Sequence, residues 1–404
     1  MLKSKHLETI SKIRLPERYA IDSASNGLSI INVKEPEANI DVTLEPFRSR
    51  RGTCRRVLAH LKDERNFIIE FARFNEDYNK RINGIIRARK PIIEGNLLRL
   101  DNPRYREDTI APIDAVQIFE RVHQSWTDGI RYNIELLNDS DQVIRSGLRK
   151  PQIGALHAIF SHWTLSSDTA CIVLPTGTGK TEVMIATAIG AVSKRVLVIV
   201  PTDALRQQTV NRSKTYGILN KIGIINDLPF PIVGALYSKP TYEHFDALRN
   251  CNIVISTMSS IGLADETVQK DFAALFSHIF FDEAHHIEAA TWKRFHKQTG
   301  SAKILLLTAT PFREDGKPLK GKIIYNFPLG TAQEHGYFKR IRFLEVFEPD
   351  ERFSDEKIAH TAVTRLREDQ AAGYDHILMA RARCCTQIDL MGRSSKDAWS
   401  GDTN

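Results

Sequence analysis

Six short, almost entirely apolar runs lie in the middle of this 404-residue chain, at residues 170–174, 195–200, 231–236, 252–256, 278–281 and 303–307. Apolar runs of this length without alternation are typical of strands buried on both faces, as in parallel sheets. Helix-length segments such as 181–192 and 203–214 separate them. The succession predicts β-α-β-α units and therefore an α/β fold with a doubly wound parallel sheet. Ligands of such sheets bind at the carboxyl ends of the strands.

The change of pattern along the chain predicts three regions, residues 1–147, 148–345 and 346–404. The first is expected to be a mixed α+β region of unknown role. Within it, apolar residues spaced by three and four over 67–85 predict an amphipathic helix. The basic residues on its other face would either follow phosphates or simply be solvated. The last region opens with an acidic helical stretch at 350–370 and a strand at 376–380, the start of a second domain.

Composition narrows the class of protein. The formal net charge is +7, and no apolar run approaches the roughly 18 residues that cross a bilayer. The N-terminus lacks an apolar signal core, so we expect a globular protein in the cytosol. The basic balance is compatible with a polyanionic partner without proving one. The five cysteines form no CxxC pair or regular framework, which favours buried, reduced thiols.

A phosphate-binding loop is the first string that carries chemistry. Residues 174–181 read LPTGTGKT, directly after a predicted strand and directly before a predicted helix. Gly177 and Gly179 allow the backbone N–H groups to surround a polyphosphate, and the helix N-terminus adds partial positive charge. Lys180 is expected to reach the β- and γ-phosphates, and Thr181 to hold magnesium through its hydroxyl. Leu174 replaces the first glycine of the GxxxxGK[ST] pattern, so the string is a variant of it.

A pair of carboxylates, Asp282 and Glu283, follows the predicted strand 278–281. An acidic residue at a strand end can bind the magnesium that Thr181 holds, and an adjacent Glu can orient and deprotonate water. A zinc site made of nearby histidines is the competing reading, with His278, His285 and His286 as its ligands. It is disfavoured because neither HExxH nor a cysteine at ligand spacing is present.

Taken in order, these strings resemble the motifs of superfamily 2 helicases, in the branch shared with type I and type III restriction translocases. Residues 147–152 resemble that family's adenine-reading element, 174–181 its motif I and 282–285 its motif II in DEAH form. The resemblance implies a RecA-like P-loop NTPase domain over 148–345 that binds ATP and Mg²⁺. The implied catalytic residues are Glu283, Asp282, Lys180 and His285, with Thr181 and Asp282 as magnesium ligands. The implied ATP-binding residues are Gln152, Thr176, Gly177, Thr178, Gly179, Lys180 and Thr181.

Three further strings extend the resemblance to nucleic acid. Residues 200–206 resemble motif Ia, 255–258 motif Ib and 307–313 motif III. The TATPFR sequence in the last of these looks more like DNA translocases than RNA helicases, so DNA is the expected partner rather than RNA. The implied contacts are Pro201, Thr202, Arg206, Ser256 and Thr257, and the implied coupling residues are Thr308, Ala309 and Thr310. Several of the implied site residues also have a plain structural reading: Thr202 could cap a helix, Gln152 could be a first-turn helix residue, Ser256 and Thr257 could close a strand, and Thr308 and Thr310 could be turn hydroxyls.

The second motor domain of that family is not matched by the sequence. Its QxxGRxxR element is absent, and we interpret residues 391–396 as a coincidental likeness to it. The sequence therefore predicts an ATP-hydrolysing nucleic-acid helicase or translocase, as an incomplete motor fragment. Three alternatives stay open: an ATP-dependent nucleic-acid-binding module, a motor subunit of a restriction or phage-defence complex without motor activity of its own, and a generic P-loop phosphotransferase. The last is disfavoured by the strings that resemble motifs Ia, Ib and III.

Overall fold

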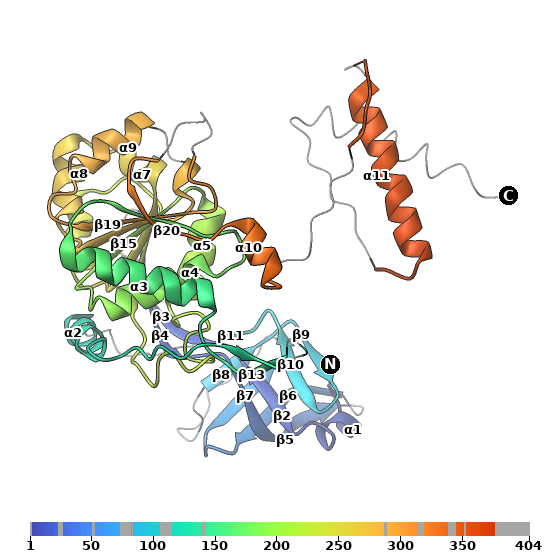
Figure 1. Cartoon of the computed structure of the whole chain (residues 1–404). Helices are drawn as coiled ribbons and strands as arrows, with labels where there is room; N and C mark the ends of the chain where they lie inside the picture. The colour runs from blue at the N-terminus through green and yellow to red at the C-terminus, as the bar shows by residue number, and fades with distance from the viewer. Residues whose placement is uncertain are drawn as a thin grey trace. The chain divides into compact units, whose positions relative to one another are not determined.

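The chain divides into two compact units, Met1–Tyr337 and Phe338–Asn404. The computed structural model (Figure 1) describes residues 2–22, 27–50, 53–72, 82, 84–105, 115–138, 140, 142–286, 289–312, 319–337, 345–350 and 353–375. No helix among these residues is long and apolar enough to span a membrane.

A nine-stranded sheet forms the centre of the first unit, in the order β20-β14-β19-β18-β15-β17-β16-β4-β3. Seven of the strands run parallel. These are β14 (Ala170–Val173), β15 (Val196–Val200), β16 (Ile232–Leu236), β17 (Ile253–Thr257), β18 (His278–Phe281), β19 (Lys303–Thr308) and β20 (Lys322–Asn326). The six predicted strands and the α/β class are confirmed, whereas β20 was not predicted.

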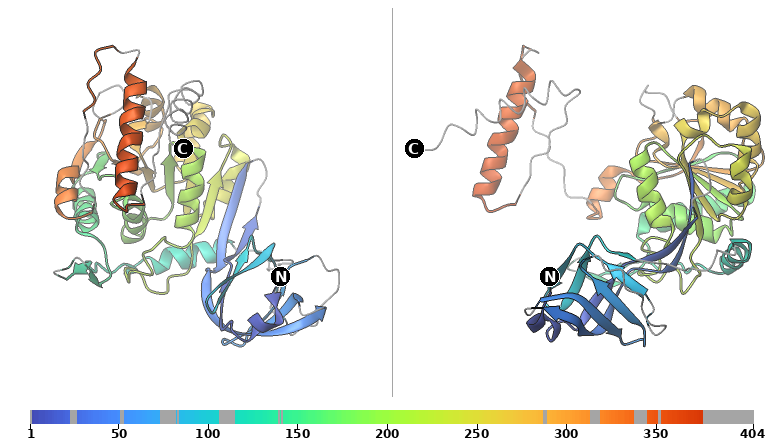
Figure 2. Two further views of the ribbon diagram at one scale, coloured as in Figure 1. Left: turned by 90° about the vertical axis from the view of Figure 1, so that its right-hand side faces the viewer. Right: turned by 180° about the vertical axis from the view of Figure 1, so that it is seen from behind.

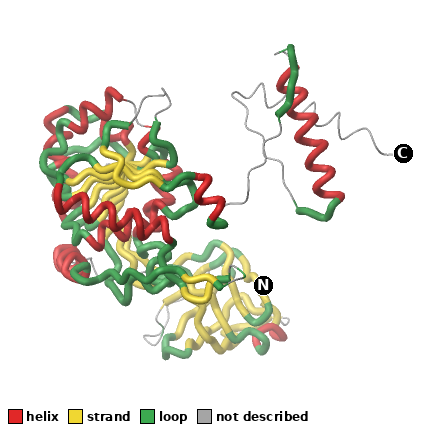
Figure 3. The backbone as a smooth tube through the Cα atoms, viewed as in Figure 1, coloured by secondary structure: helices red, strands yellow, loops and turns green. Residues whose placement is uncertain are grey.

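Helices cover the two faces of this sheet, as Figure 3 shows with red helices on either side of yellow strands. On one face, the apolar strands share a buried core with the helices between residues 242 and 296. Helices α4 and α5 confirm the two helices predicted over 181–192 and 203–214. The helices are α3 (Lys150–Leu165), α4 (Lys180–Gly190), α5 (Asp203–Ser213), α6 (Tyr242–Arg249), α7 (Met258–Gly262), α8 (Glu266–Ala273), η1 (Ala284–His286), α9 (Ala289–His296) and α10 (Leu329–Glu334).

Part of the N-terminal region completes the central sheet. Strands β3 (Arg18–Asp22) and β4 (Leu28–Glu35) form a hairpin, and β4 pairs antiparallel with β16, from Ile232↔Asn32 to Leu236↔Leu28 (Figure 2). Helix α2 (Ala115–Ser125) adds Phe119 to the same core. Because an open edge strand invites pairing with another chain, the hairpin protects β16.

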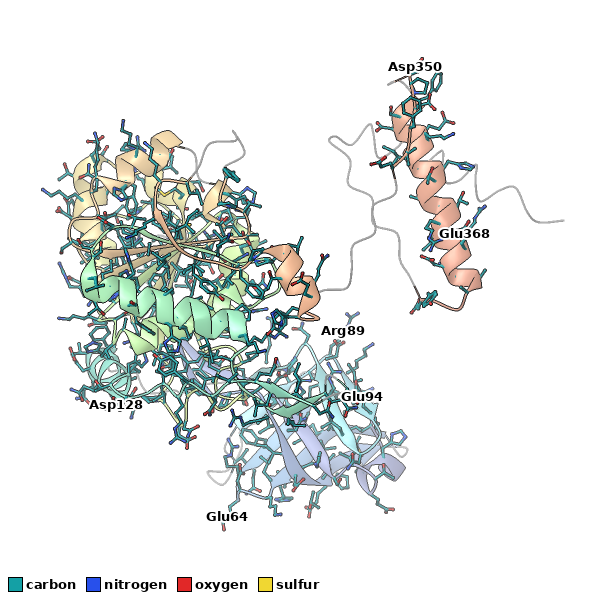
Figure 4. All side chains as sticks on the ribbon, in the orientation of Figure 1. Glu64, Arg89, Glu94, Asp128, Asp350 and Glu368 are labelled. Atoms are coloured by element: carbon teal, nitrogen blue, oxygen red, sulfur yellow. The ribbon has the colours of Figure 1, made fainter. Side chains whose placement is uncertain are left out.

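The rest of the N-terminal region is a second nine-stranded sheet, in the order β11-β8-β7-β6-β5-β2-β10-β9 with β1 paired to β6. Charged side chains such as Arg89 and Glu94 are exposed on it (Figure 4). The N-terminal region also contains three short elements, α1 (Ser4–Leu7), β12 (Leu136–Leu137) and β13 (Val143–Arg145). Its strands are β1 (Leu2–Lys3), β2 (Lys12–Leu15), β5 (Ala38–Arg50), β6 (Thr53–Leu61), β7 (Asn66–Glu70), β8 (Gly84–Arg87), β9 (Lys90–Glu94), β10 (Leu97–Asp101) and β11 (Arg104–Tyr105).

The amphipathic helix predicted over 67–85 is wrong where the structure describes it. Phe67 lies in β7 and Ile85 in β8, and these two strands pair in parallel. Three consecutive residues of β7, Phe67, Ile68 and Ile69, are fully buried, which a one-sided helix would not produce. Pairing with β6 and β8 thus overrides the local spacing of three and four. Residues 73–81 of the expected helix lie outside the described residues.

In the second unit, the acidic stretch forms α11 (Ser354–Ala371), as predicted. The predicted strand at 376–380 and the string at 391–396 lie outside the described residues. The two domain boundaries drawn from the sequence, at 147/148 and 345/346, remain predictions.

Candidate functional site

The loop between β14 and α4 curls around the N-terminus of α4. Gly177 and Gly179 have φ angles of +86° and +94°, which only glycine adopts without strain. A Cβ atom at Gly179 would lie 2.1 Å from Gln152 Nε2. The Thr178 hydroxyl donates to the Pro175 carbonyl at 2.6 Å, and Thr178 is fully buried. The loop therefore presents backbone N–H groups at a helix N-terminus, an arrangement that suits a polyphosphate.

Lys180, the first residue of α4, is only 7% exposed. Its Nζ atom lies 2.9 Å from Glu283 Oε1 and donates weakly to the Leu174 carbonyl at 3.5 Å. The ion pair therefore joins the loop after β14 to Glu283, the second residue after β18. Glu283 has a left-handed φ of +47°, a conformation that non-glycine residues hold only where their surroundings enforce it.

Asp282, which directly follows β18, is 8% exposed, and its Oδ1 accepts a hydrogen bond from the Glu283 N–H at 3.0 Å. Burial, and then the neighbouring Glu283 carboxylate, raise the pKa of Asp282 to about 6, against the opposing effect of Lys180. Glu283 Oε2 is also buried and accepts no hydrogen bond within the described part of the chain. Two crowded, desolvated carboxylates of this kind favour a cation between them and a bound phosphate, so the site fits Mg²⁺.

A cavity of about 760 Å³ unites these groups. Its lining includes Gln152 and every predicted residue of the loop except Thr178, together with Asp282 and Glu283. Gln152 Nε2 donates to the Gly179 carbonyl at 3.4 Å, and its Oε1 accepts from the Arg149 N–H at 2.8 Å. Gln152 is thus both a first-turn residue of α3 and part of the cavity wall.

The sequence reasoning missed one ion pair in this cavity. Arg212 Nη1 on α5 lies 3.0 Å from Glu182 Oε1 on α4, and both residues line the cavity. Glu182 directly follows the LPTGTGKT string, which could have drawn attention to it. No local spacing relates it to Arg212, 30 residues later.

The three residues expected to couple nucleotide to nucleic acid, Thr308, Ala309 and Thr310, lie at the end of β19, and His285 contacts them from the turn after β18. His285 Nδ1 and Thr308 Oγ1 are 2.9 Å apart, and Thr308 Oγ1 donates to the Thr310 carbonyl at 2.7 Å. Ala309 is half-buried between the two threonines. His285 Nδ1 also lies 3.5 Å from Glu283 Oε2, so one histidine contacts both the carboxylate site and the end of β19.

The expected nucleic-acid contacts divide into exposed and buried residues. Thr202 is exposed at the end of β15, and its hydroxyl accepts from the Leu205 N–H at 3.3 Å as the N-cap of α5. Thr257 caps α7 in the same way through the Ser260 N–H at 3.2 Å and is 1% exposed. Ser256 is fully buried. Pro201 and Thr202 line a second cavity of about 500 Å³ at this edge of the sheet.

Arg206 is not at the surface, contrary to what a phosphate contact requires. It is 3% exposed, its Nη2 atom lies 3.1 Å from Asp203 Oδ1, and its guanidinium carbon lies 4.2 Å from the centre of the Tyr237 ring. In this conformation Arg206 supports its neighbours rather than a ligand.

The zinc alternative finds no support in the described residues. His278 begins β18 and His285 follows the other end of that strand. No group of three or more His, Cys, Asp or Glu side chains in the described part of the chain could hold a metal ion. Cys54, Cys171 and Cys251 are buried, free thiols, as predicted, and burial raises the pKa of Cys171 to about 11.

The fold and the site together define a RecA-like domain of the superfamily 2 helicase type. Residues 145–313 match the family described as type III restriction enzyme, res subunit. The DNA 3′-5′ translocase XPB2 of Sulfurisphaera tokodaii is 31% identical over 166 residues, 40% of this chain. The chain spans about a third of that relative's length, since the match covers 32% of it.

Solved structures with a similar trace include the UvsW helicase from bacteriophage T4, at 15% identity and a TM-score of 0.32, over 48% of this chain and 61% of that one. The type ISP restriction-modification enzyme LlaBIII bound to DNA matches at 17% identity and a TM-score of 0.35, over 69% of this chain and 22% of that one. The Hef helicase domain of Pyrococcus furiosus matches at 20% identity and a TM-score of 0.33, over 61% and 54% of the two chains.

Proposed function

We propose that this chain binds and hydrolyses ATP with Mg²⁺ and that nucleic acid, in particular DNA, stimulates the hydrolysis. The observation that carries the proposal is the ion pair between Lys180 Nζ and Glu283 Oε1, 2.9 Å long, inside a cavity formed by a phosphate-type loop. A cation from the loop and a carboxylate from the end of β18 thus meet where a triphosphate would end.

The ion pair gives Lys180 and Glu283 consecutive roles. Phosphate oxygens that enter the cavity compete with Glu283 for Lys180, because the lysine binds the β- and γ-phosphates. Glu283 released in this way is free to orient a water molecule and accept its proton. Thr181 and Asp282 would hold Mg²⁺, which neutralises phosphate charge when bound. Gln152, which lines the same cavity, would read the adenine ring.

DNA is the proposed partner because the curated relative is a DNA translocase, and the sequence around Thr308 to Arg313 favours the DNA-translocating branch. The residues proposed to contact it, Pro201 and Thr202, lie at the carboxyl end of β15, whereas Ser256 and Thr257 are buried at the end of β17. His285, in contact with Thr308, would relay the state of the nucleotide to this edge. Translocation or unwinding by the full motor belongs to the same proposal.

The experiment separates binding from hydrolysis. Lys180→Ala is expected to weaken binding of Mg-ATP by at least about tenfold, or ~1.4 kcal/mol, in calorimetry. Glu283→Gln is expected to bind Mg-ATP normally but to lose phosphate release, because its role begins with the attack of water. Lys194→Ala, an exposed lysine of the same domain, is the control and should match the wild type. Equal affinity of the wild type and Lys180→Ala would refute the assignment of the site.

A further inference from the structure

Tyr237 is an exposed aromatic residue at the edge where nucleic acid is expected to bind. It directly follows β16, whose five residues are all buried, yet 42% of Tyr237 is exposed. Strands β15, β17 and β16 are neighbours in the sheet and run parallel, so their carboxyl ends lie at one edge. Thr202 and Thr257 occupy the other two ends, and Tyr237 belongs to none of the helicase-like strings.

The guanidinium group of Arg206 packs against the ring of Tyr237. Its guanidinium carbon lies 4.2 Å from the ring centre, the closest cation–ring contact in the described part of the chain. Arg206 Nε and Nη1 are buried and donate no hydrogen bond within the described residues. Burying unpaired guanidinium N–H groups costs free energy, and the contact with the ring face offsets part of that cost. The Tyr237 hydroxyl also donates to Gln207 Oε1 at 3.3 Å, so α5 holds the ring at two points.

The N-terminal hairpin holds the backbone of Tyr237 through a hydrogen bond. The Tyr237 N–H donates to the Gly27 carbonyl at 2.7 Å, next to the pairing of β4 with β16. Gly27 has a φ of +88°, and a Cβ atom there would lie 2.7 Å from Ser238 Oγ. Backbone and ring are therefore both fixed, although the ring itself remains accessible.

We propose that the accessible face of Tyr237 stacks on a base of single-stranded DNA that crosses this edge of the sheet. The inference rests on the proposed function and adds a specific contact to it. A fixed ring that has a cation against it, in a residue that is 42% exposed, suits a stacking platform, and stacking accepts every base because each has a π-face. Phosphate contacts alone would not need an ordered aromatic ring. Arg206 is then a positioning residue for this ring.

The test compares two oligonucleotides with the same number of phosphates, oligo-dT and an abasic strand, at one salt concentration. Stacking predicts that Tyr237→Ala weakens binding of oligo-dT by about 5- to 150-fold, the equivalent of ~1–3 kcal/mol per stacked base, and leaves the abasic strand unchanged. Tyr237→Phe should keep most of the affinity, because it loses only the hydroxyl. Tyr132→Ala is the matched control: Tyr132 is 43% exposed but packs on His157 and Phe160 of α3.

Each outcome decides the inference. Equal binding of oligo-dT by the wild type and Tyr237→Ala would overturn it and leave the proposed function intact. Wild-type protein that binds Mg-ATP but neither strand would overturn both the inference and the nucleic-acid part of the proposed function. Should Tyr237→Ala fail to fold, Tyr237→Trp replaces it: its fluorescence should be quenched by oligo-dT and not by the abasic strand, and equal signals would refute stacking.

Discussion

His278, the first residue of β18, should make the stability of the motor domain depend on pH. Its ring lies 5.1 Å from that of Trp163, its Nδ1 is 2.9 Å from Ser277 Oγ, and the residue is 6% exposed. Lys303 pairs with it across the strands. Burial, and then the charge of Lys303, lower the pKa of His278 to about 4. The folded state therefore resists the proton that the unfolded chain accepts near pH ~6.5.

The sign and size of the effect follow from this difference. Between about pH 6.5 and pH 4 the unfolded chain binds more protons than the folded chain, so stability falls as the pH falls. A gap of roughly 2.5 pKa units corresponds to about 3 kcal/mol once the pH reaches 4. Between about pH 7.5 and pH 5.5, the same two pKa values give a loss of about 1.4 kcal/mol from this one residue.

Urea unfolding at these two pH values, followed by tryptophan fluorescence, measures the loss. His278→Phe keeps an aromatic ring and removes the titration, so its stability should fall by about 1.4 kcal/mol less than that of the wild type. His157→Gln, an exposed histidine of the same domain, should behave as the wild type does. Equal losses in the wild type and His278→Phe would show that His278 is not held neutral by its surroundings.

Two further substitutions test the nucleotide loop and the relay, and a third serves as a control. Gly179→Ala is expected to lower Mg-ATP affinity by about tenfold or more in calorimetry, since its Cβ would collide with Gln152 in a left-handed backbone. Gly300→Ala, also left-handed at φ +57° but with no described atom within 4 Å of its Cβ, should cost about 1 kcal/mol of stability and leave ATP binding alone. Thr308→Val removes the contact with His285 and is expected to keep ATP binding while reducing DNA stimulation of phosphate release severalfold; undiminished stimulation would exclude the relay.

Much of the motor domain could be predicted because short stretches of sequence determine its strands and the positions of its loops. A strand buried on both faces, such as β15, must be apolar throughout, and the residues directly after β14 and β18 must meet at one edge of a parallel sheet. The loop around Lys180 and the carboxylates at 282–283 were therefore found from their positions after strands. Edge strand β20 was not predicted because its residues are exposed or half-buried and do not form a long apolar run.

Other features depend on partners that the local sequence does not reveal. Leu28 and Ile30 of β4 alternate as a half-buried strand does, but nothing nearby indicates that β16 is the neighbour. Arg206 was expected at the surface because a family string predicted a phosphate contact there. Its burial depends on packing against Tyr237, which follows β16 and lies far from Arg206 in the sequence. The apolar spacing around Phe67 is compatible with a helix as well as with a strand. Only the pairing of β7 with β8 shows that this segment is a strand.

The hairpin that completes the central sheet also sets the order of events during synthesis. Asn32 pairs with Ile232, so 232 − 32 = 200 residues separate the two strands along the chain. At about 5–20 residues per second, a ribosome adds that length in roughly 10–40 s. During this interval β3 and β4 exist without their neighbour, and an isolated two-stranded hairpin is only marginally stable in water. The nascent chain therefore carries an unfinished sheet edge until β16 emerges, and a chaperone that shields strands 18–35 would act in that window.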